Sequence, residues 1–448
     1  MRHCDLTIVV MKAMARTFLS SARIQIARRR RQLANIWFEE GREGLNEWFR
    51  TAAATWLQPR RIAWPVLPQD ALVADLSRPR PESRIRSSGP ISINWVTTPS
   101  GPGSGGHTTC YRIIKYLDKA GYDNRVFFYH VHRADQKYFE GVAREYYGLT
   151  CPIEDIRSGM PDADAVVATS WPTAYVAFNA ACSGKRFYFV QDFEPHFYPV
   201  GTYSVMAENT YRMGFHGITA GAWLAQKLTR EYGMDADYFP FGSDTSRYHR
   251  DPASRRSGVA FYVRSGTPRR GSELGLLALE LFAKRRPHAQ IHLFGDKLEG
   301  LSFDCINHGP VSPAKLNDIY NQCFAGLCLS FTNVSLVPYE MLAAGCVPVV
   351  NDADHNRIVL DNPYVRYAPA TPHALASALE EILETADFNA LSRLASESVK
   401  SMTWDDAAAA VDVAFKRALN ASRPPGMHSG SNGSASSVSV ARLFAHDR

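Results

Sequence analysis

The sequence predicts an α/β protein built from two doubly wound, Rossmann-like domains that face a cleft. Short apolar runs alternate with amphipathic helical segments from residue 91 onward, and the alternation restarts near Gly258. In each unit, a loop rich in glycine or arginine follows the first apolar run directly. This alternation is typical of a parallel sheet with helices on both faces. A chain of 448 residues has room for two such domains and for terminal extensions.

The first domain is predicted over residues 91–245 and the second over residues 257–402. In the first domain we expect strands at 91–96, 126–129, 165–168, 186–190, 217–219 and 238–241. In the second domain we expect strands at 259–264, 291–294, 324–329 and 347–350. An amphipathic helix over 403–420 closes the fold. The tail, 421–448, is poor in apolar residues and is expected to be disordered.

Residues 1–80 are predicted to form a basic helical extension, followed by a linker at 74–90 that is rich in proline, serine and charge. Residues 1–60 contain eleven Lys+Arg and five Asp+Glu, so they account for the whole net charge of +6. The main body is therefore neutral, and nucleic-acid binding is not expected. Apolar residues between 20 and 50 have helical spacing beside the run Arg28 to Arg31. This segment is either a helix on an anionic membrane surface or a helical hairpin packed on the main body.

The eight cysteines form no CxxC pair and no His/Cys metal spacing, which is typical of reduced thiols in a cytosolic protein. No apolar run approaches the roughly 18 residues that a membrane span needs. We therefore expect a cytoplasmic protein, peripheral on the inner face of the membrane if its extension binds lipid. Asp162 and Asp164 precede a buried strand and are interpreted as a turn, so no metal site is predicted.

A glycine-rich loop follows the first predicted strand and includes Gly105 and Gly106 at the start of a helix. Glycines there let the backbone approach a ligand and leave N–H groups free for an anion. The loop lacks the G-x-G-x-x-G spacing of dinucleotide sites and the Gly-Lys-Ser/Thr end of a nucleotide-hydrolysing loop. An oxidoreductase is therefore disfavoured, and a plain strand–helix turn is the alternative interpretation.

Arg264 and Arg270 flank the turn after the first strand of the second domain, where ligands of open α/β sheets bind. Guanidinium groups suit diphosphates, although solvated surface arginines are the alternative. Further along, Ser335 and Leu336 open a short helix whose N–H groups and dipole favour a phosphate. Glu340, on the same helix, can accept hydrogen bonds from sugar hydroxyls. Together these features indicate a nucleotide-sugar site.

Asp192, Glu194 and His196 form the densest cluster of ionisable residues after a strand of the first domain. We name them as candidate catalytic residues, because such groups can orient an acceptor or stabilise positive charge at an anomeric carbon. Ordinary loop polarity is the alternative interpretation.

The order of these motifs resembles the retaining GT-B glycosyltransferases of family 4. It runs from the glycine-rich loop through Arg-x5-Arg-Gly to Ser-Leu-Val-Pro-x-Glu-x-x-Ala-x-Gly-x-Pro-Val-Val. Within that family, residues 189–201 and 214–224 resemble the rhamnosyltransferases that build bacterial surface glycans. The resemblance covers about residues 90–420. It implies the GT-B fold and transfer of a sugar with retention of configuration.

The resemblance also implies roles for individual residues. Arg264 and Arg270 would hold the donor diphosphate, the N–H groups of Ser335 and Leu336 would cap its distal phosphate, and Glu340 would bind the ribose. Gly105 and Gly106 would face the donor across the cleft. The chain departs from the family at Thr332, where many relatives carry the first Glu of an E-x7-E pattern.

The expected reaction is transfer of L-rhamnose from dTDP-L-rhamnose to a growing cell-surface polysaccharide, with a lipid-linked glycan as acceptor. No cofactor is expected besides the nucleotide-sugar co-substrate, because the arginines and the helix take the place of a metal. Two alternatives remain open. The sugar could be mannose, glucose or fucose, or the chain could be a non-catalytic sugar-nucleotide-binding subunit of a glycan synthesis complex.

Overall fold

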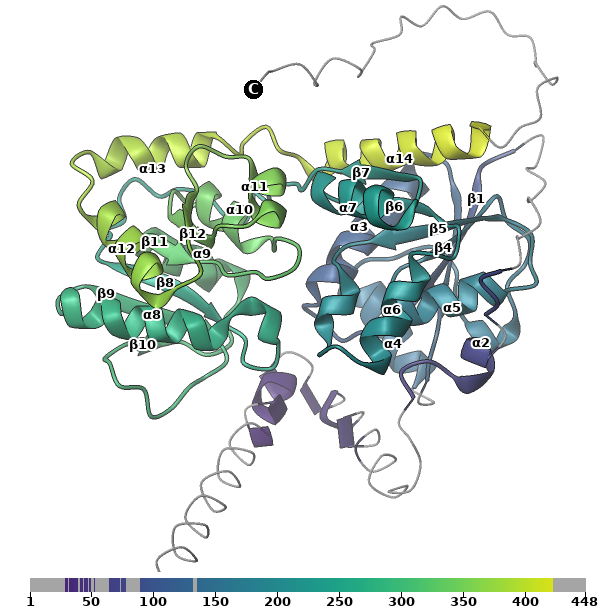
Figure 1. Ribbon diagram of the computed structural model, residues 1–448, viewed down its shortest axis with the longest axis horizontal. Coiled ribbons are helices and arrows are strands. Elements are labelled where there is room, and N and C mark those ends of the chain that lie inside the picture. The colour runs from purple at the N-terminus through teal and green to yellow at the C-terminus, as the bar shows by residue number, and fades with distance from the viewer. Residues whose placement is uncertain are drawn as a thin grey trace, which may run out of the picture.

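The computed structural model describes residues 89–131 and 135–421, together with 64–72, 74–77 and shorter stretches between 29 and 52. Two α/β domains lie side by side, and the chain crosses back from the second to the first between α13 (Phe388–Glu397) and the last helix (Figure 1). The prediction of two doubly wound domains is confirmed. The predicted tail lies outside the described residues, as does most of the linker.

The first domain is built on a parallel sheet with the strand order β3-β2-β1-β4-β5-β6-β7. Its strands are β1 (Ser92–Thr97), β2 (Asp123–Phe128), β3 (Ile153–Asp155), β4 (Ala165–Ala168), β5 (Lys185–Val190), β6 (His216–Ala220) and β7 (Ala236–Phe239). The described helices are α2 (Pro68–Leu72), α3 (Gly105–Lys119), α4 (Gln136–Glu145), α5 (Trp171–Asn179), α6 (Thr202–Thr210) and α7 (Ala222–Tyr232), with 3-10 turns η1 (Ile156–Ser158) and η2 (Glu194–Phe197). The central strands are buried on both faces, as their continuous apolar runs require.

The second domain has a parallel sheet of order β10-β9-β8-β11-β12-β13. Its strands are β8 (Gly258–Val263), β9 (Gln290–Gly295), β10 (Ile306–Asn307), β11 (Cys323–Leu327), β12 (Val347–Asn351) and β13 (Arg366–Ala368). Its helices are α8 (Ser272–Arg285), α9 (Pro313–Gln322), α10 (Val337–Ala343), α11 (Asp354–Leu360), α12 (Pro372–Leu383) and α13 (Phe388–Glu397), with the 3-10 turn η3 (Pro268–Arg270). The strand order reverses between β8 and β11, so the loops after these strands form the crevice in which ligands of this fold class bind.

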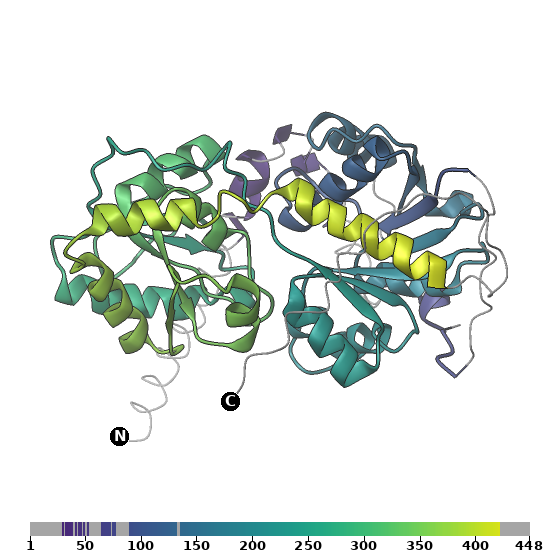
Figure 2. The ribbon, with the colours of Figure 1, turned by 90° about the horizontal axis from the view of Figure 1, so that it is seen from above.

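The C-terminal helix α14 (Trp404–Ala421) leaves the second domain and packs on the first, as Figure 2 shows from above. Asp412 accepts a hydrogen bond of 2.5 Å from the Tyr122 hydroxyl, and the Phe415 ring lies 4.8 Å from that of Phe187. Where α14 begins, the chain pairs with the other crossing segment, because the Ser243 N–H donates to the Met402 carbonyl at 2.7 Å. Two crossing segments joined in this way form the connection between the domains.

The domains also meet directly beside this connection. Gly221 has a φ of +86°, and a Cβ on it would lie 2.9 Å from the Val359 side chain of the other domain. The left-handed backbone and the close approach both require glycine there. The Trp223 and His355 rings meet edge to face across the same boundary at 5.4 Å. The structure therefore shows the two domains closed against each other at this point.

The described residues of the extension between 29 and 49 are helical. The Asn35 side chain donates to Asp296 Oδ1 at 2.9 Å, so this helix touches the second domain at the end of β9. Trp37, Phe38 and Phe49 remain exposed by 58%, 59% and 54%. The extension thus combines a contact with the main body, as a docked hairpin requires, with exposed aromatic side chains, as a membrane helix requires.

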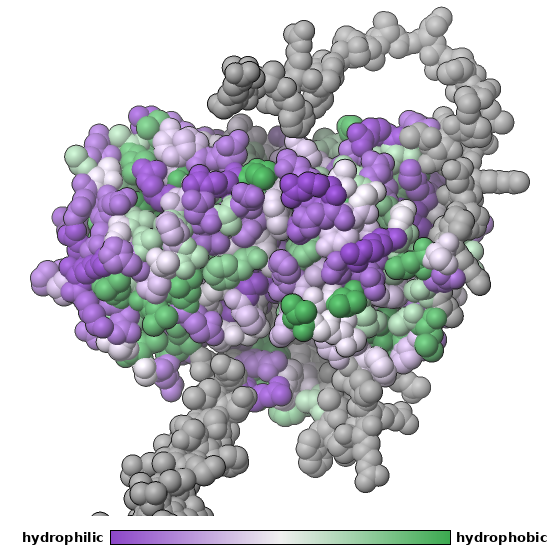
Figure 3. Space-filling view, viewed as in Figure 1, coloured by the Kyte–Doolittle hydropathy of each residue, from purple (hydrophilic) through white to green (hydrophobic). Residues whose placement is uncertain are grey.

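Polar side chains dominate the face of the molecule in Figure 3, where apolar side chains of both domains form small separate groups. Within the part of the chain that the structure describes, no helix has the length and apolar content needed to cross a bilayer. An interaction with lipid would therefore depend on the extension rather than on this face.

Candidate functional site

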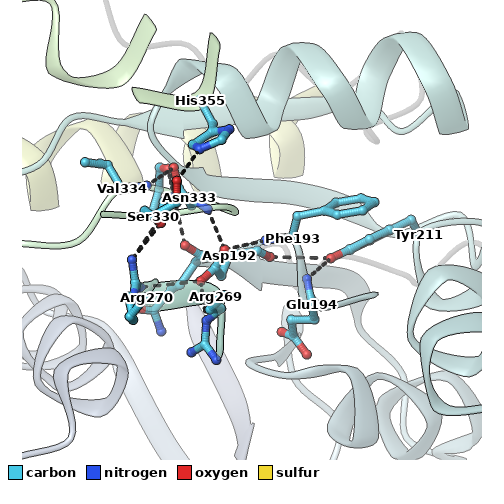
Figure 4. A network of polar contacts seen from close by, with 12 residues as sticks. Asp192, Phe193, Glu194, Tyr211, Arg269, Arg270, Ser330, Asn333, Val334 and His355 are labelled. Atoms are coloured by element: carbon cyan, nitrogen blue, oxygen red, sulfur yellow. Dashed lines mark hydrogen bonds and ion pairs between the residues drawn. The ribbon is translucent and has the colours of Figure 1, made fainter. Parts of the chain in front are cut away.

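Asp192 and Arg270, one predicted site residue from each domain, meet where the chain after β5 faces the loops after β8 and β11, and Glu194 lies nearby (Figure 4). The centre of this cluster is Arg270, on η3 at the end of the β8 loop. Its Nη1 atom donates to Ser330 Oγ at 2.8 Å and to the Asn333 carbonyl at 3.1 Å. Its side chain is only 17% exposed, and this burial lowers the pKa of the guanidinium. A cation fixed in this way is prepared for an anionic ligand.

Arg264 lies at the other end of the same loop and takes a different direction. Its side chain is exposed. Its Nη1 atom donates to the hydroxyl of Tyr262, on β8, at 2.6 Å, and its guanidinium lies over the ring of the same tyrosine. The structure therefore does not bring Arg264 and Arg270 onto one point. A part for Arg264 in donor binding stays a prediction.

Arg269, next to Arg270 on η3, also belongs to this cluster, and the sequence interpretation missed it. Its Nε atom lies 3.3 Å from Asp192 Oδ2, and its guanidinium carbon lies 3.9 Å from the centre of the Phe197 ring. Arg269 thereby contacts the segment after β5 through an ion pair and a cation–π contact. The consecutive arginines 269 and 270 were the available signal, but spacing alone does not say which side chains face the cleft.

Asp192 follows β5 by two residues and contacts the other domain. Its Oδ1 atom accepts hydrogen bonds from the N–H groups of Phe193 at 2.9 Å and Asn333 at 2.7 Å. Its Oδ2 atom lies 3.3 Å from Arg269 Nε and 3.7 Å from Arg270 Nη2. A carboxylate from the first domain therefore lies against the arginine pair of the second, rather than standing alone on the acceptor side.

Glu194 and His196 occupy different environments. The Glu194 carboxyl is buried, accepting from the Trp171 N–H at 2.7 Å and the Tyr188 hydroxyl at 3.1 Å, and burial raises its pKa to about 8. The Trp171 contact places this carboxyl at the start of α5. A catalytic part for Glu194 stays a prediction. His196 is exposed on η2, with its ring 4.7 Å from that of Phe193.

Asn333 is a second residue that sequence reasoning missed. It is fully buried, and its Nδ2 atom donates to the carbonyl oxygens of Gln191 at 2.9 Å and Ala220 at 2.8 Å. These oxygens belong to the ends of β5 and β6 in the first domain. The loop between β11 and α10 is thus attached to the opposite domain. An asparagine in a loop carries no sequence signal for such a contact.

The histidine of α11 supports the same loop. A ring nitrogen of His355 lies 2.7 Å from the Ser330 carbonyl, and Asn351 Nδ2 donates to that oxygen at 2.7 Å. Burial lowers the pKa of His355. Ser330, whose hydroxyl receives Arg270, is therefore held from two further elements.

Ser335 and Leu336 are partly buried and immediately precede α10, which begins at Val337. The Oε2 atom of Glu340, on α10, accepts a hydrogen bond of 3.2 Å from the Tyr320 hydroxyl. Burial raises the pKa of the Glu340 carboxyl to about 7. This places Glu340 and the two loop residues on one short segment, as predicted. Their contact with a nucleotide sugar is not tested by the structure.

Gly105 and Gly106 form the start of α3 beside the end of β5. The Gly106 carbonyl accepts from Gln191 Nε2 at 3.0 Å, and a Cβ on Gly106 would lie 3.5 Å from that atom. At Gly105, nothing among the described residues lies within 4 Å of an added Cβ. The open space leaves the backbone of Gly105 approachable from the cleft.

Asp162 and Asp164 act as the turn interpretation predicted. Asp162 accepts from the Ser183 N–H at 2.7 Å, and Asp164 accepts from the N–H and hydroxyl of Ser92 at 2.8 and 3.0 Å. Both carboxylates therefore hold together the segments at the amino ends of the strands, whereas the cleft lies at their carboxyl ends.

Comparisons with known proteins agree with this architecture. Two family models match the chain, "WsaF, N-terminal domain" over residues 102–220 and "WsaF, C-terminal domain" over residues 257–380. The O-antigen biosynthesis protein RfbC of Myxococcus xanthus is 29% identical over 391 residues, which are 81% of this chain and 30% of that protein. The chain thus spans about a third of the length of this relative.

Solved structures share the fold at low identity. Sucrose-phosphate synthase from Thermosynechococcus elongatus superposes with a TM-score of 0.55 at 13% identity, over 74% of this chain and 100% of its own. HepE of Anabaena in complex with UDP-glucose gives a TM-score of 0.55 at 15% identity, over 74% and 100%. The two domains of this chain are therefore WsaF-type domains with the GT-B fold.

Proposed function

We propose that this protein is a retaining glycosyltransferase that moves a sugar from a nucleotide diphosphate donor to a growing surface polysaccharide. The observation that carries the proposal is Arg270, a buried cation at the point where the strand order of the donor domain reverses. The largely buried guanidinium suits an anionic ligand, and this crevice is where such sheets bind ligands. The complex of HepE with UDP-glucose supports a sugar nucleotide as that ligand.

The chemistry follows from charge development at the leaving group. As the bond from the anomeric carbon to the diphosphate breaks, negative charge grows on the phosphate oxygens. Arg270 and the N–H groups of Ser335 and Leu336 would stabilise that charge, and Glu340 would orient the ribose. The donor domain supplies cations for this work, so we propose that transfer needs no divalent metal.

On the acceptor side, we propose a direct role for His196, a positioning role for Asp192 and a structural role for Glu194. The His196 side chain on η2 is exposed at its surface, and partial desolvation of its ring together with the Lys227 charge lowers the pKa of the imidazole. A neutral imidazole can accept a proton from an acceptor hydroxyl. Glu194 instead holds α5 in place through the Trp171 N–H.

L-Rhamnose from dTDP-L-rhamnose is the donor that we propose first. Thr332 stands where many relatives carry a carboxylate for the transferred sugar, and its buried Oγ1 has no hydrogen-bond partner among the described residues. A 6-deoxy sugar offers one hydroxyl fewer for a protein group to satisfy. The name of the RfbC relative supports a surface glycan as acceptor, and the basic extension suits a lipid-linked one. A transferase for mannose, glucose or fucose is the alternative within the class.

A donor screen tests the proposal. The full chain would be incubated with dTDP-L-rhamnose, UDP-glucose, GDP-mannose and GDP-fucose and a lipid-linked glycan extract, and nucleoside diphosphate release would be followed together with the mass of the glycan. We expect release and a matching mass increase with one donor, with Arg393→Gln as an active control on the surface of α13. Tight binding of a donor without transfer would instead favour the non-catalytic binding subunit.

A further inference from the structure

The arginine pair that would receive the donor already holds an anion from the other domain. Asp192 Oδ2 lies 3.3 Å from Arg269 Nε and 3.7 Å from Arg270 Nη2. The Asp192 side chain is 12% exposed, and those of Arg269 and Arg270 are 25% and 17% exposed. Little water reaches these three side chains. Their charges therefore interact more strongly than they would at the protein surface.

Arg270 does not depend on Asp192 for its position. Two hydrogen bonds from its Nη1 atom, to Ser330 Oγ and to the Asn333 carbonyl, fix its guanidinium within the second domain. Arg269 is held more loosely. Its buried Nε atom forms no hydrogen bond with any described residue, so its contact with Asp192 is an ion pair without hydrogen-bond alignment. This ion pair therefore neutralises the charge of Arg269 but does little to fix the position of its guanidinium.

A diphosphate bound to these arginines would lie within a few ångströms of the Asp192 carboxylate. Like charges at that separation in a partly buried site oppose each other, so the two anions disfavour simultaneous binding. Replacement of the carboxylate by a diphosphate would also affect the chain segment that follows Asp192, because this segment contacts Arg269 as well. Phe197, five residues further on, lies under the Arg269 guanidinium, and His196 lies between them in sequence.

We propose that Asp192 is an internal counter-anion that competes with the donor diphosphate for Arg269 and Arg270. Donor binding then displaces its carboxylate from the arginines and frees the segment from Asp192 to Phe197 to receive the acceptor. The inference rests on the proposed function, because it takes the diphosphate of a sugar nucleotide as the competing anion. It makes Asp192 a positioning residue that couples the two substrates, with the donor binding first.

Titration of the full chain with UDP and with dTDP tests the competition. Asp192→Asn keeps an oxygen that can accept the N–H groups of Phe193 and Asn333 but removes the charge, so we expect tighter binding by about 5- to 150-fold, the usual range of coupling between ligands. Asp192→Ser is a second neutral variant with the same expectation, and Asp192→Glu keeps the charge and should show no gain. Asp155→Asn, which removes a carboxylate paired with Arg157 at β3, is the matched control.

Uridine and thymidine provide the specificity test, because a nucleoside carries no phosphate to compete with Asp192. Their affinities should be equal in the wild type and Asp192→Asn. Weaker or unchanged UDP and dTDP binding in the neutral variants, with melting temperatures showing that they fold, would overturn the inference. So would an equal gain for the nucleosides. If none of UDP, dTDP and GDP binds the wild type or any variant, the proposed function itself fails.

Discussion

The side-chain nitrogen of Asn333 lies 2.8 Å from the carbonyl oxygen of Ala220, and this hydrogen bond joins the donor-domain loop to the end of β6 in the other domain. The same nitrogen also donates to the Gln191 carbonyl, and the backbone N–H of Asn333 donates to Asp192. One buried asparagine therefore holds the domains closed beside the arginine pair.

Asn333→Ala should weaken this closure. The carbonyls of Gln191 and Ala220 would lose a buried donor, and an unsatisfied buried group costs about 1–3 kcal/mol. We expect lower unfolding free energy in chemical denaturation and weaker binding of UDP or dTDP in calorimetry. Asn321→Ala is the control, since Asn321 is also buried but donates to His249 and Asn317 rather than to the carbonyls after β5 and at the end of β6. Equal losses of nucleotide affinity in both variants would contradict a specific closing role.

The two arginines of the β8 loop should differ in importance. Arg270→Gln removes a buried cation that points to the cleft, so kcat/KM should fall by about 30- to 1000-fold. Arg264 is exposed and turned towards Tyr262, so Arg264→Gln should cost less unless donor binding reorients it. Steady-state kinetics of both variants with the donor found in the screen give the comparison. A larger loss for Arg264→Gln would indicate that the diphosphate binds beside Arg264, at the start of the β8 loop, rather than beside Arg270.

Stability should depend on pH through Glu194. Burial raises its pKa from 4.5 to about 8, so the folded protein binds a proton that the unfolded chain releases between these values. The resulting stabilisation is complete below about pH 4.5 and is lost as the pH rises to about 8, by at most about 1.4 kcal/mol per pH unit. Glu194→Gln should flatten this slope in denaturation curves across that window. Glu280→Gln, an exposed change on α8, should leave the slope intact, and an unchanged slope in Glu194→Gln would refute the assignment.

The extension makes two separable predictions. If it binds lipid, replacing Arg29 and Arg30 by Gln should weaken binding to anionic vesicles by about 2 kcal/mol, or roughly 30-fold, because each cation near such a surface contributes about 1 kcal/mol. The control is the pair Arg230→Gln and Arg393→Gln, whose side chains are 79% and 56% exposed on the main body. If the extension instead docks on the second domain, Asn35→Ala should lower the melting temperature by removing the contact with Asp296, and vesicle binding should be absent in all variants.

The fold could be predicted because its strands are long apolar runs, and buried parallel strands produce that pattern directly. The strands β3, β10 and β13 were not predicted, since two or three residues give no periodic signal. The glycine and arginine loops after the first strands predicted where the site lies, and that location stays a prediction. The directions of the side chains could not be predicted. Arg264 and Arg270 bracket one turn in sequence but donate to different partners, and Glu194 turns inward on η2 to meet Trp171.

The central claim is that the buried cation at the end of β8 receives the diphosphate of a sugar nucleotide, and a structure of the full chain bound to UDP or dTDP tests it most directly. The account predicts phosphate oxygens within hydrogen-bond distance of the Arg270 guanidinium and of the N–H groups of Ser335 and Leu336. It also predicts that the Asp192 carboxylate has moved away from the arginines. A nucleotide bound elsewhere, with Arg270 still beside Asp192, would contradict it.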